Sequence, residues 1–378
     1  MPQPHLNCFA ITPPGAEILC AKELETLGIK AEIQPGGVAF CALIRDLYRV
    51  NLWSRVAARI LVRLAEFRCR DFPELYRQAL RLPWGRYLRA GQPFQIRVSR
   101  RESRLNHSGR ISDSLRAAIE KTLGPPAGVQ THNQLIFVRF AQDQCTISID
   151  SSGELLHFRG YRQTAVTAPL RENLAAAILL KLGYDGSQPL LDAMCGSGTL
   201  AIEAALLAAG IAPGRARDFS FMHWPHYRPH VWTLCLQEQG KPAPQRAIIL
   251  ANDQDSKALA ATATNAHCAG VGEELQLHLG GAEELTAPAP AGILLCNPPY
   301  GERLGHAAQL LPWYKTLGNA WQKNFPFWHI GWVCADPRFA GAMHLNCQRR
   351  WSFSNGGITV ELRYRPGQAT RVCDKIMS

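Results

Sequence analysis

Apolar positions in the first 160 residues recur with two periods, alternating over short stretches and spaced three or four apart over longer ones. The first period is typical of strands with one buried face, and the second of amphipathic helices. Pairs such as Pro13-Pro14 and Gly36-Gly37 separate the stretches. The pattern predicts an α+β region, with strands at 8–12, 38–41, 93–98, 135–140 and 145–151 and helices at 15–27, 72–82 and 111–123.

The second half of the chain has a different pattern, in which short apolar runs alternate with longer helical stretches. Such an alternation predicts an α/β domain with a mostly parallel sheet. The last two runs are joined by Asn355-Gly356-Gly357, which favours an antiparallel hairpin at the end of the sheet. The seven predicted strands lie at 190–192, 247–251, 275–281, 293–296, 329–333, 351–353 and 358–364, and helices begin near Leu170, Thr199 and Ser256.

The first strand of this half runs into a glycine turn, in the stretch LLDAMCGSGTLAIEAA from Leu190 to Ala205. Glycines let a backbone approach a ligand closely, and the start of the following helix offers free N–H groups. The acid at the strand end, Asp192, can accept hydrogen bonds from a polar or cationic ligand. The turn lacks the spacing of a GxGxxG dinucleotide site and the ending of a P-loop. Taken alone, it is either a ligand site or a purely structural strand–helix turn.

A second motif, ILLCNPPY from Ile293 to Tyr300, places a rigid turn after another buried strand. Two consecutive prolines keep the backbone extended and remove two donors, so the turn presents carbonyls and the side chain of Asn297. The competing interpretation is a rigid surface turn. Together and in this order, the two motifs resemble class I S-adenosylmethionine-dependent methyltransferases that act on exocyclic amino groups. The resemblance implies a Rossmann-like fold for this domain and S-adenosylmethionine (SAM) as the cofactor.

The resemblance also implies catalytic residues on the second motif. The side-chain oxygen of Asn297 and the carbonyl of Pro298 would accept the N–H bonds of the target amine, and Tyr300 would stack on the base. Pro299 would complete the rigid turn.

Cofactor contacts are expected from loops at the strand ends. An acid at the tip of the second strand, Asp253, is well placed to accept the ribose hydroxyls, while Asp255 caps the following helix. The other candidate contacts, which the resemblance implies in the glycine turn, after the third strand and at the end of the linker, are Asp192, Met194, Cys195, Gly196, Gly198, Thr199, Ala282, Pro169 and Leu170. Near Ala282, where related enzymes carry an acid, the contact comes either from Glu283 or from the backbone.

Longer stretches around both motifs resemble one branch of these enzymes. NPPYGERLG, and the linker GYR followed by APLRENLAAAIL, look like THUMP-containing guanine N2-methyltransferases, which act on large-subunit ribosomal RNA or on transfer RNA. The resemblance implies a ferredoxin-like segment at 1–50, a THUMP-like RNA-binding domain at 51–160 and a methyltransferase domain at 161–378. Methylation of adenine N6 in DNA, methylation of a protein, and a non-catalytic RNA-binding or ribosome-assembly role are the alternatives.

The net charge of +11 is concentrated in one stretch. Between Arg55 and Lys121 there are 16 Lys or Arg against 6 Asp or Glu, and 15 of the 16 are Arg. Such an excess is either a solvated basic face or a surface for a polyanion, and Arg favours the second because it binds phosphate with two parallel hydrogen bonds. The partner is expected to be RNA, and the candidate contacts are Arg97, Arg100, Arg101, Arg104 and Arg110.

Other features of the composition narrow the class of protein. Hydrophobic residues make up 47% of the chain, which indicates a globular fold, and no apolar run has the length of a membrane span. No secretory signal is read at the start, and the twelve cysteines form no CxxC pair, so a cytoplasmic protein without a metal site is expected. The insert between Gly210 and Gln245 carries His223, His226 and His230 at loose spacing, and a wet aromatic loop is the preferred interpretation.

Overall fold

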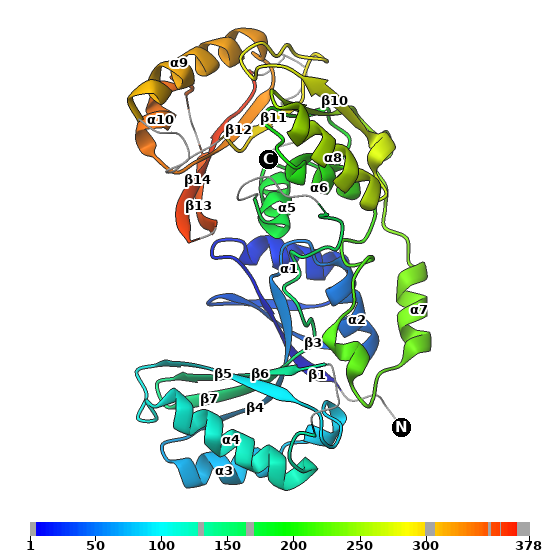
Figure 1. Ribbon diagram of the computed structural model, residues 1–378, viewed down its shortest axis with the longest axis vertical. Coiled ribbons are helices and arrows are strands. Elements are labelled where there is room, and N and C mark those ends of the chain that lie inside the picture. Colours follow the sequence, from blue (N-terminus) through cyan, green and yellow to red (C-terminus); the bar gives the residue numbers. More distant parts are fainter. Residues whose placement is uncertain are drawn as a thin grey trace. The chain divides into compact units, whose positions relative to one another are not determined.

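The computed structural model describes residues 5–127, 132–163, 170–298, 307–346, 349–355 and 357–368. The chain forms two compact units, each built on its own seven-stranded sheet (Figure 1). The first unit comprises Met1–Thr12, Cys20–Leu156 and Arg217–Glu238, and the second comprises Pro13–Leu19, His157–Ala216 and Gln239–Ser378. After residue 216 the chain therefore leaves the second unit, contributes a segment to the first, and returns.

The sheet of the first unit has the strand order β2-β3-β1-β4-β7-β6-β5. Neighbouring strands are antiparallel except β5 and β6, which run parallel. A register shift between Arg63 and Ala65 marks a bulge in β4, which increases the local twist. The strands are β1 (Leu6–Ile11), β2 (Ala31–Gln34), β3 (Gly37–Ala42), β4 (Arg59–Arg68), β5 (Phe94–Arg101), β6 (Gln134–Ala141) and β7 (Gln144–Asp150), and the helices are α1 (Glu17–Thr26), α2 (Ile44–Trp53), α3 (Phe72–Leu80), the 3₁₀ turn η1 (Trp84–Arg86) and α4 (Ser108–Leu123).

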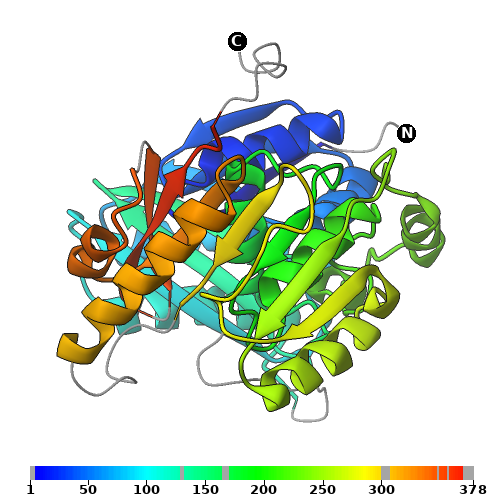
Figure 2. The same ribbon diagram turned by 90° about the horizontal axis from the view of Figure 1, so that it is seen from above.

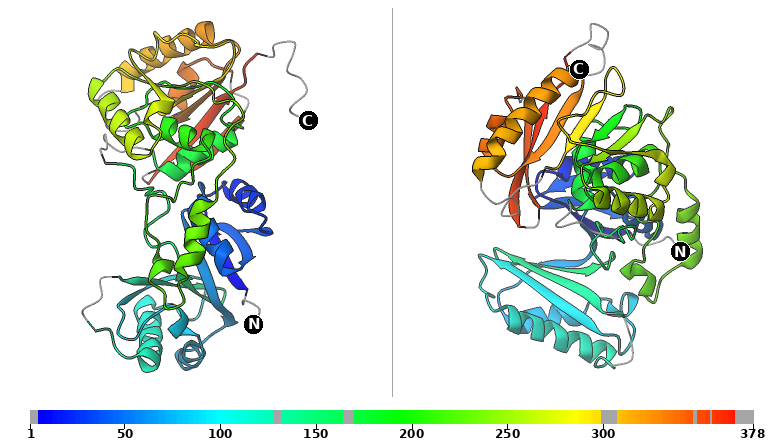
Figure 3. Two further views of the ribbon diagram at one scale, coloured as in Figure 1. Left: turned by 90° about the vertical axis from the view of Figure 1, so that its right-hand side faces the viewer. Right: turned by 45° about the horizontal axis from the view of Figure 1, so that its top comes forward.

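Helices α3 and α4 lie side by side along one face of β5, β6 and β7 (Figure 3). Every second residue of these strands points to that face, and Ile136, Val138 and Ile147 are completely buried. Helix α3 begins where the carboxylate of Asp71 accepts the N–H of Glu74 at 2.7 Å. The opposite strand faces, which these helices do not cover, keep more polar residues.

The segment Arg217–Glu238 packs into the first unit, and the expectation of a wet aromatic loop is wrong. Phe219, Phe221 and Trp224 are at most 2% exposed. The ring of Phe221 stacks on Tyr48 of α2, with centroids 4.2 Å apart. The physical reason is that these rings find apolar partners on elements far away in sequence, so burial removes their surface from water.

Buried hydrogen bonds hold the same segment in place. The side-chain oxygen of Gln134 accepts from Ser220 Oγ and from Trp224 Nε1, both at 2.9 Å. At the far end, Glu238 forms an ion pair with Arg49 at 2.8 Å. The segment contains a 3₁₀ turn, η2 (Ser220–His223), and the helix α7 (Pro229–Gln237), which contacts α2.

The sheet of the second unit has the order β10-β9-β8-β11-β12-β14-β13. The first five strands are parallel and the last two form the predicted antiparallel hairpin, at the opposite end from β10 (Figure 2). The strands are β8 (Leu190–Asp192), β9 (Ile249–Asp253), β10 (Leu275–Leu279), β11 (Ile293–Cys296), β12 (His329–Cys334), β13 (Arg349–Asn355) and β14 (Ile358–Arg365). The helices are α5 (Glu172–Lys181), α6 (Thr199–Ala208), α8 (Ser256–Cys268), the 3₁₀ turn η3 (Gly272–Glu274), α9 (Ala307–Asn324) and α10 (Pro337–Ala342).

Helices cover both faces of this sheet, with α9 and α10 on one side and α5, α6 and α8 on the other (Figure 1). Buried tryptophans, among them Trp321, Trp328 and Trp332, fill the side of α9. The strand order reverses between β8 and β11, because the chain runs outward in both directions from this pair. In open parallel sheets, ligands bind at the carboxyl ends of strands where such a reversal occurs.

The predicted fold class, an α+β first region and a seven-stranded Rossmann-like second domain, is confirmed. The strand predicted at 93–98 continues to Arg101. Its last residues are exposed and polar, so the apolar alternation that marks the strand in the sequence ends before the strand does. The pattern missed β2, β4, α2, α7, α9 and α10. Within the described ranges, no helix combines the length and hydropathy that crossing a membrane requires.

We predict that Trp224→Ala destabilises the first unit and spares the second. Truncating a buried aromatic ring costs about 3–5 kcal/mol, and the indole of Trp224 donates to Gln134 of the first unit. Native-state hydrogen exchange should show lost protection in β4, β6 and β7, with β8, β9 and β11 unchanged. The control is His230→Ala, an exposed position of the same segment. Equal loss in both sheets would contradict the assignment of this segment.

Candidate functional site

The glycine turn after β8 adopts backbone angles that require glycine. Gly196 and Gly198 have φ angles of 55° and 84°, in the left-handed region that side chains disfavour. Gly198 is also the N-cap of α6, and a Cβ atom there would lie 2.7 Å from Cγ2 of Thr262. The turn therefore brings bare backbone to the carboxyl end of the sheet at the start of a helix, where N–H groups are free to bind a ligand.

Side chains from β9 and α8 hold this turn in place. Oδ2 of Asp253 accepts the N–H of Gly196 at 2.9 Å, and Thr262 Oγ1 donates to the carbonyl of the same glycine at 2.9 Å. Asn265 Nδ2 donates to the carbonyl of Ser197 at 3.0 Å. Because both sides of the loop are tied down, its free N–H groups keep fixed directions.

Asp253, the acid at the tip of β9, already uses both oxygens. Oδ1 accepts the N–H of Asp255 at 3.0 Å, in addition to the bond from Gly196 to Oδ2. A carboxylate has about four acceptor sites, so two remain for outside donors such as hydroxyls. Asp255 caps α8 by accepting the N–H of Lys257 at 2.9 Å, which confirms the predicted cap.

Asp192 ends β8 with both carboxylate oxygens buried, and neither has a hydrogen-bond partner among the described residues. Burial raises the pKa of Asp192 to about 7; the N–H groups of Ala201 and Met194 oppose the shift, and the charge of Asp253 adds to it. Those two N–H groups face the carboxylate without meeting ordinary hydrogen-bond geometry. A buried carboxylate without partners is costly, so this position favours a ligand that brings a cation or donors.

Asn297 lies at the same edge of the sheet as the glycine turn. Strands β8 and β11 are parallel neighbours, with Asp192 opposite Leu295, so Asn297 follows directly beyond the paired residues. Its Oδ1 is buried without a partner among the described residues, and Pro298 beside it is buried. Pro299 and Tyr300, and also Pro169 of the linker, lie outside the described residues. The edge thus carries unsatisfied acceptors from both strands.

The remaining candidate cofactor contacts lie around the turn. Cys195 is buried with its thiol 3.5 Å from Thr262 Oγ1, and burial raises its pKa. Leu170 and Thr199 are buried, and Met194 is half-buried against the core on the α9 side. Ala282 is buried, and its carbonyl accepts the indole N–H of Trp321 at 2.9 Å.

Arg162, in the linker before α5, is a site residue that the sequence motifs did not indicate. Its guanidinium donates to Ser197 Oγ and to Thr199 Oγ1, each at 2.9 Å, and pairs with Glu172 at 2.8 Å. It also donates to the carbonyl of Leu170 at 3.4 Å. Burial raises the pKa of Glu172, and the charge of Arg162 opposes that shift. Arg162 belongs to the GYR stretch on which the resemblance rests, but no local pattern indicates that its side chain reaches the glycine turn.

The five candidate RNA contacts are all exposed, and the fold does not gather them in one place. Arg97 and Arg101 lie on one side of β5, while Arg100 lies on the other, where its Nε donates to Ser108 of α4 at 3.3 Å. Arg110 stacks over Phe72 at the helix side, 4.3 Å from the ring centroid. Arg104 lies in the connection between strand and helix.

The site's free groups fit SAM. The cationic centres of SAM would pair with the buried carboxylate of Asp192, and its ribose hydroxyls would donate to the open acceptor sites of Asp253. The carboxylate of SAM would bind the N–H groups at the start of α6. No group of three or more His, Cys, Asp or Glu in the described ranges could hold a metal ion, and His223 stacks on His132 instead.

Three family profiles match consecutive parts of the chain. An RlmL ferredoxin-like domain matches residues 7–61, a THUMP domain matches residues 69–150, and an RMKL-like methyltransferase domain matches residues 159–363.

Relatives that match along most of this chain agree with the profiles. A "Ribosomal RNA large subunit methyltransferase K/L" from Syntrophotalea carbinolica is 35% identical over 377 residues, which is 94% of this chain and 53% of that protein. The chain thus spans about half the length of the K/L relatives. A protein of Synechocystis sp., whose name describes a candidate RNA methyltransferase, is 31% identical, with 94% of this chain and 95% of that protein covered.

Solved structures share the architecture. A methyltransferase structure "complexed with SAH" is 30% identical, with a TM-score of 0.87 over 98% of this chain and 100% of that chain. Another, from Listeria monocytogenes, is named "a predicted N6-adenine-specific DNA methylase" and is 26% identical, with a TM-score of 0.88 and 97% of each chain covered. The methyltransferase profile and the SAH in the first of these structures together identify SAM as the cofactor.

We predict that Asp192 makes the stability of the ligand-free protein depend on pH. Its carboxyl is protonated in the native state up to about pH 7 but ionises near pH 4 when unfolded. The unfolded state therefore releases the proton first, and stability falls between these values by on the order of 1 kcal/mol per pH unit. Asp192→Asn should remove this fall, measured by denaturant unfolding from pH 4.5 to 8, and should abolish SAH binding.

The matched control for that series is Asp185→Asn. Asp185 is exposed, and its hydrogen bond from Ser187 lowers its pKa, so it titrates below the tested window. A wild-type slope that Asp192→Asn leaves unchanged would refute the assignment to Asp192.

We predict that Arg162→Lys weakens SAH binding about tenfold by loosening the glycine turn. An ammonium cannot reproduce the forked bonds to Ser197 and Thr199, and a charge-assisted hydrogen bond contributes about 1.5–3 kcal/mol. Calorimetry should show the affinity loss, and hydrogen exchange should show faster exchange of the turn. Arg171→Lys, at the exposed N-cap of α5, is the control. Weaker binding without faster exchange would mean that Arg162 acts on the ligand directly.

Proposed function

The chain belongs to the family of RMKL-like methyltransferases, and on that premise we propose that it methylates the N2 amino group of a guanine in RNA. Large-subunit ribosomal RNA is the first candidate substrate, because relatives carry that name, and transfer RNA is the second. In this proposal residues 1–50 and 51–160 hold the RNA, residues 161–378 carry out the transfer, and the protein acts in the cytoplasm.

The unpartnered side-chain oxygen of Asn297 is the observation that supports this proposal most directly. An exocyclic amine on a base is a poor nucleophile, because its lone pair is delocalised into the ring. Acceptors that hold both N–H bonds let the nitrogen become pyramidal and turn its lone pair toward the methyl group. In the proposed arrangement Asn297 Oδ1 accepts one N–H and the carbonyl of Pro298 accepts the other.

Residues of this chain would also stabilise the charge that builds up during transfer. SAM supplies an activated methyl group on a sulfonium, so the chemistry needs no strong base. Positive charge that develops on the amine is stabilised by fixed acceptor dipoles at the edge of the sheet. The tied glycine turn and Asp253 would hold the donor in line with the amine, and alignment of this kind supplies much of the acceleration.

The target guanine must be unpaired or turned out of its helix, because a paired base cannot bring its amine to the sheet edge. Tyr300 would then stack on the exposed base, a contact that contributes about 1–3 kcal/mol. The THUMP match and the basic first unit support RNA as the polymer that presents this base.

The main alternative is methylation of adenine N6 in DNA. Both amines fit an NPPY turn, and the name of the Listeria protein describes that activity. Labelled SAM should therefore be offered together with ribosomal RNA from cells lacking this gene, transfer RNA and DNA, followed by digestion and mass analysis. N2-methylguanine in RNA supports the proposal. Label found only in adenine of DNA, or no label in any RNA, would contradict the proposal. A protein that binds no SAH would instead be a non-catalytic factor.

We predict that Asn297→Ala lowers kcat about 10²–10³-fold, the range seen when one preorganised polar group is removed from a reacting centre. SAH affinity should change less than about threefold, because in the proposed arrangement Asn297 faces the acceptor base rather than the cofactor. Asn319→Ala, at an exposed position of α9, is the control and should keep full activity. Undiminished kcat in Asn297→Ala would exclude this role for the side chain.

A further inference from the structure

The edge strand β5 divides the basic stretch between two faces of the first-unit sheet. Side chains alternate along a strand, so Arg97, Ser99 and Arg101 point one way while Ile96 and Val98 point toward α3 and α4. Arg100 follows the second set and contacts Ser108 of α4. Sequence proximity therefore groups arginines that the pleat separates.

The neighbouring strand adds another cation to the face that α3 and α4 leave open. Because β5 and β6 are parallel and in register, Ser99 lies opposite Arg139. With a rise of about 3.3 Å per residue, Arg97 and Arg101 lie about 13 Å apart along β5, and Arg139 lies between them on the neighbouring strand, about 4.8 Å away. All three are exposed, and Arg101 pairs with its exposed neighbour Glu102 at 3.0 Å. No acid in the described ranges forms an ion pair with Arg97 or Arg139.

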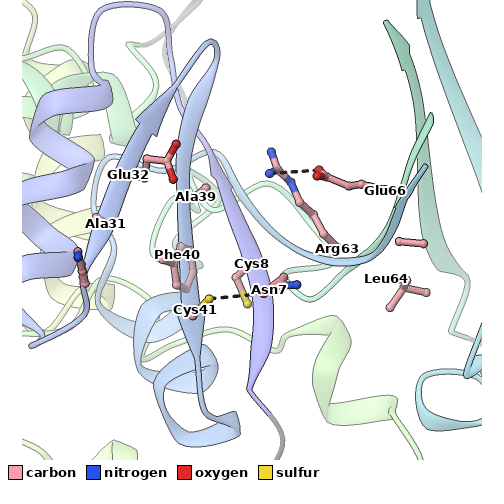
Figure 4. Close-up of a pocket in the computed structure, with 12 residues that line it drawn as sticks. Asn7, Cys8, Ala31, Glu32, Ala39, Phe40, Cys41, Arg63, Leu64 and Glu66 are labelled. Carbon is pink, nitrogen blue, oxygen red and sulfur yellow. Dashed lines mark hydrogen bonds and ion pairs between the residues drawn. The ribbon is translucent and has the colours of Figure 1, made fainter. Parts of the chain in front are cut away.

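The same sheet face continues into a cleft on β1, β2, β3 and β4, with a volume of about 560 Å³ (Figure 4). Arg63 lines it, where its guanidinium pairs with Glu66 at 3.3 Å, lies 3.1 Å from Gln34 Oε1 and sits 4.3 Å over the ring of Phe9. Burial lowers the pKa of Arg63, and the positive charge of Arg139 lowers it further, while the charge of Glu66 raises it. The side chains of Arg63 and Arg139 therefore lie close enough for their charges to interact. Lys30, Glu32 and Cys41 line the same cleft.

We propose that an RNA strand lies across this open face, with its phosphates on Arg97, Arg101 and Arg139 and one nucleotide in the cleft beside Arg63. Guanidinium groups suit phosphate, and among the described residues the only ion pair of this exposed cluster is that between Arg101 and Glu102. The cleft is large enough for a single nucleotide and offers it both a cation and acceptors. Arg100 and Arg110, on the helix side of the sheet, and Arg104, in the connection before α4, form a second set (the helix-side set) that lies outside this path. The inference rests on the proposed action on RNA.

Two triple variants with the same loss of charge test the path. Arg97→Gln/Arg101→Gln/Arg139→Gln removes the open-face cluster, and Arg100→Gln/Arg104→Gln/Arg110→Gln removes the helix-side set. The probe is protein-free large-subunit ribosomal RNA, titrated at several salt concentrations. The open-face variant should lose about 10²-fold in affinity, and its salt slope should fall by about 2–3, one unit or slightly less for each lost phosphate contact. The helix-side variant should stay within about threefold of wild type.

A native thiol gives a second readout that needs no substitution. Cys41 is exposed and lines the cleft, while Cys268 is exposed on α8 of the second unit. Saturating RNA should slow alkylation of Cys41 at least fivefold and leave Cys268 unchanged, measured by peptide mass spectrometry.

The outcomes separate this inference from the proposed function. Equal losses in the two triple variants, or unprotected Cys41 in a protein that still methylates RNA, would overturn the path alone. A wild-type protein that neither binds nor methylates RNA would overturn both. SAH binding and thermal unfolding of each variant confirm that a lost affinity does not come from a lost fold.

Discussion

The pairing of β8 with β11 is the constraint on which the rest of the site depends. The N–H of Ala193 donates to the carbonyl of Leu295 at 2.8 Å, which sets the register of two parallel strands whose crossovers leave in opposite directions. A slip of one residue would turn every side chain to the other face of the sheet. This register therefore brings the glycine turn and Asn297, about a hundred residues apart in sequence, to one edge of the sheet.

The site keeps polar groups that an ordinary core would satisfy. Asp192 and Asn297 each bury oxygen atoms without partners among the described residues, at a cost in stability, while the turn between them is bound from both sides by Thr262, Asn265 and Arg162. The free acceptors are thus held by satisfied neighbours, so they need little rearrangement when a ligand arrives. A site arranged in this way gives up folding free energy for preorganisation, which is where electrostatic catalysis gains most.

The first unit is built differently. Over β5, β6 and β7, helices α3 and α4 cover one face of its sheet and leave the other face uncovered by the described helices of this unit (Figure 3). Its core on the covered side is completed by α3 and α4, and a segment from the catalytic half of the sequence, Arg217–Glu238, packs beside α2. The arginines of the basic stretch are therefore split between two faces of the sheet. Arg100 and Arg110 lie on the side of the helices, and Arg97 and Arg101 lie on the opposite face. In the proposed path, a polyanion would contact only the open strand face of this unit.

Local rules determined much of this protein from its sequence. Apolar periodicity predicted the strands of the second sheet and five strands of the first. The glycine motif predicted the turn after β8, and the position of Asp255 predicted a helix cap, because φ restrictions and capping bonds involve only neighbouring residues. Tertiary structure alone decided the burial of Phe221 against Tyr48, the reach of Arg162 to the turn, and the two faces of the arginine stretch. Those features depend on which distant segments share space and on how a strand's pleat is oriented, and no local pattern encodes either.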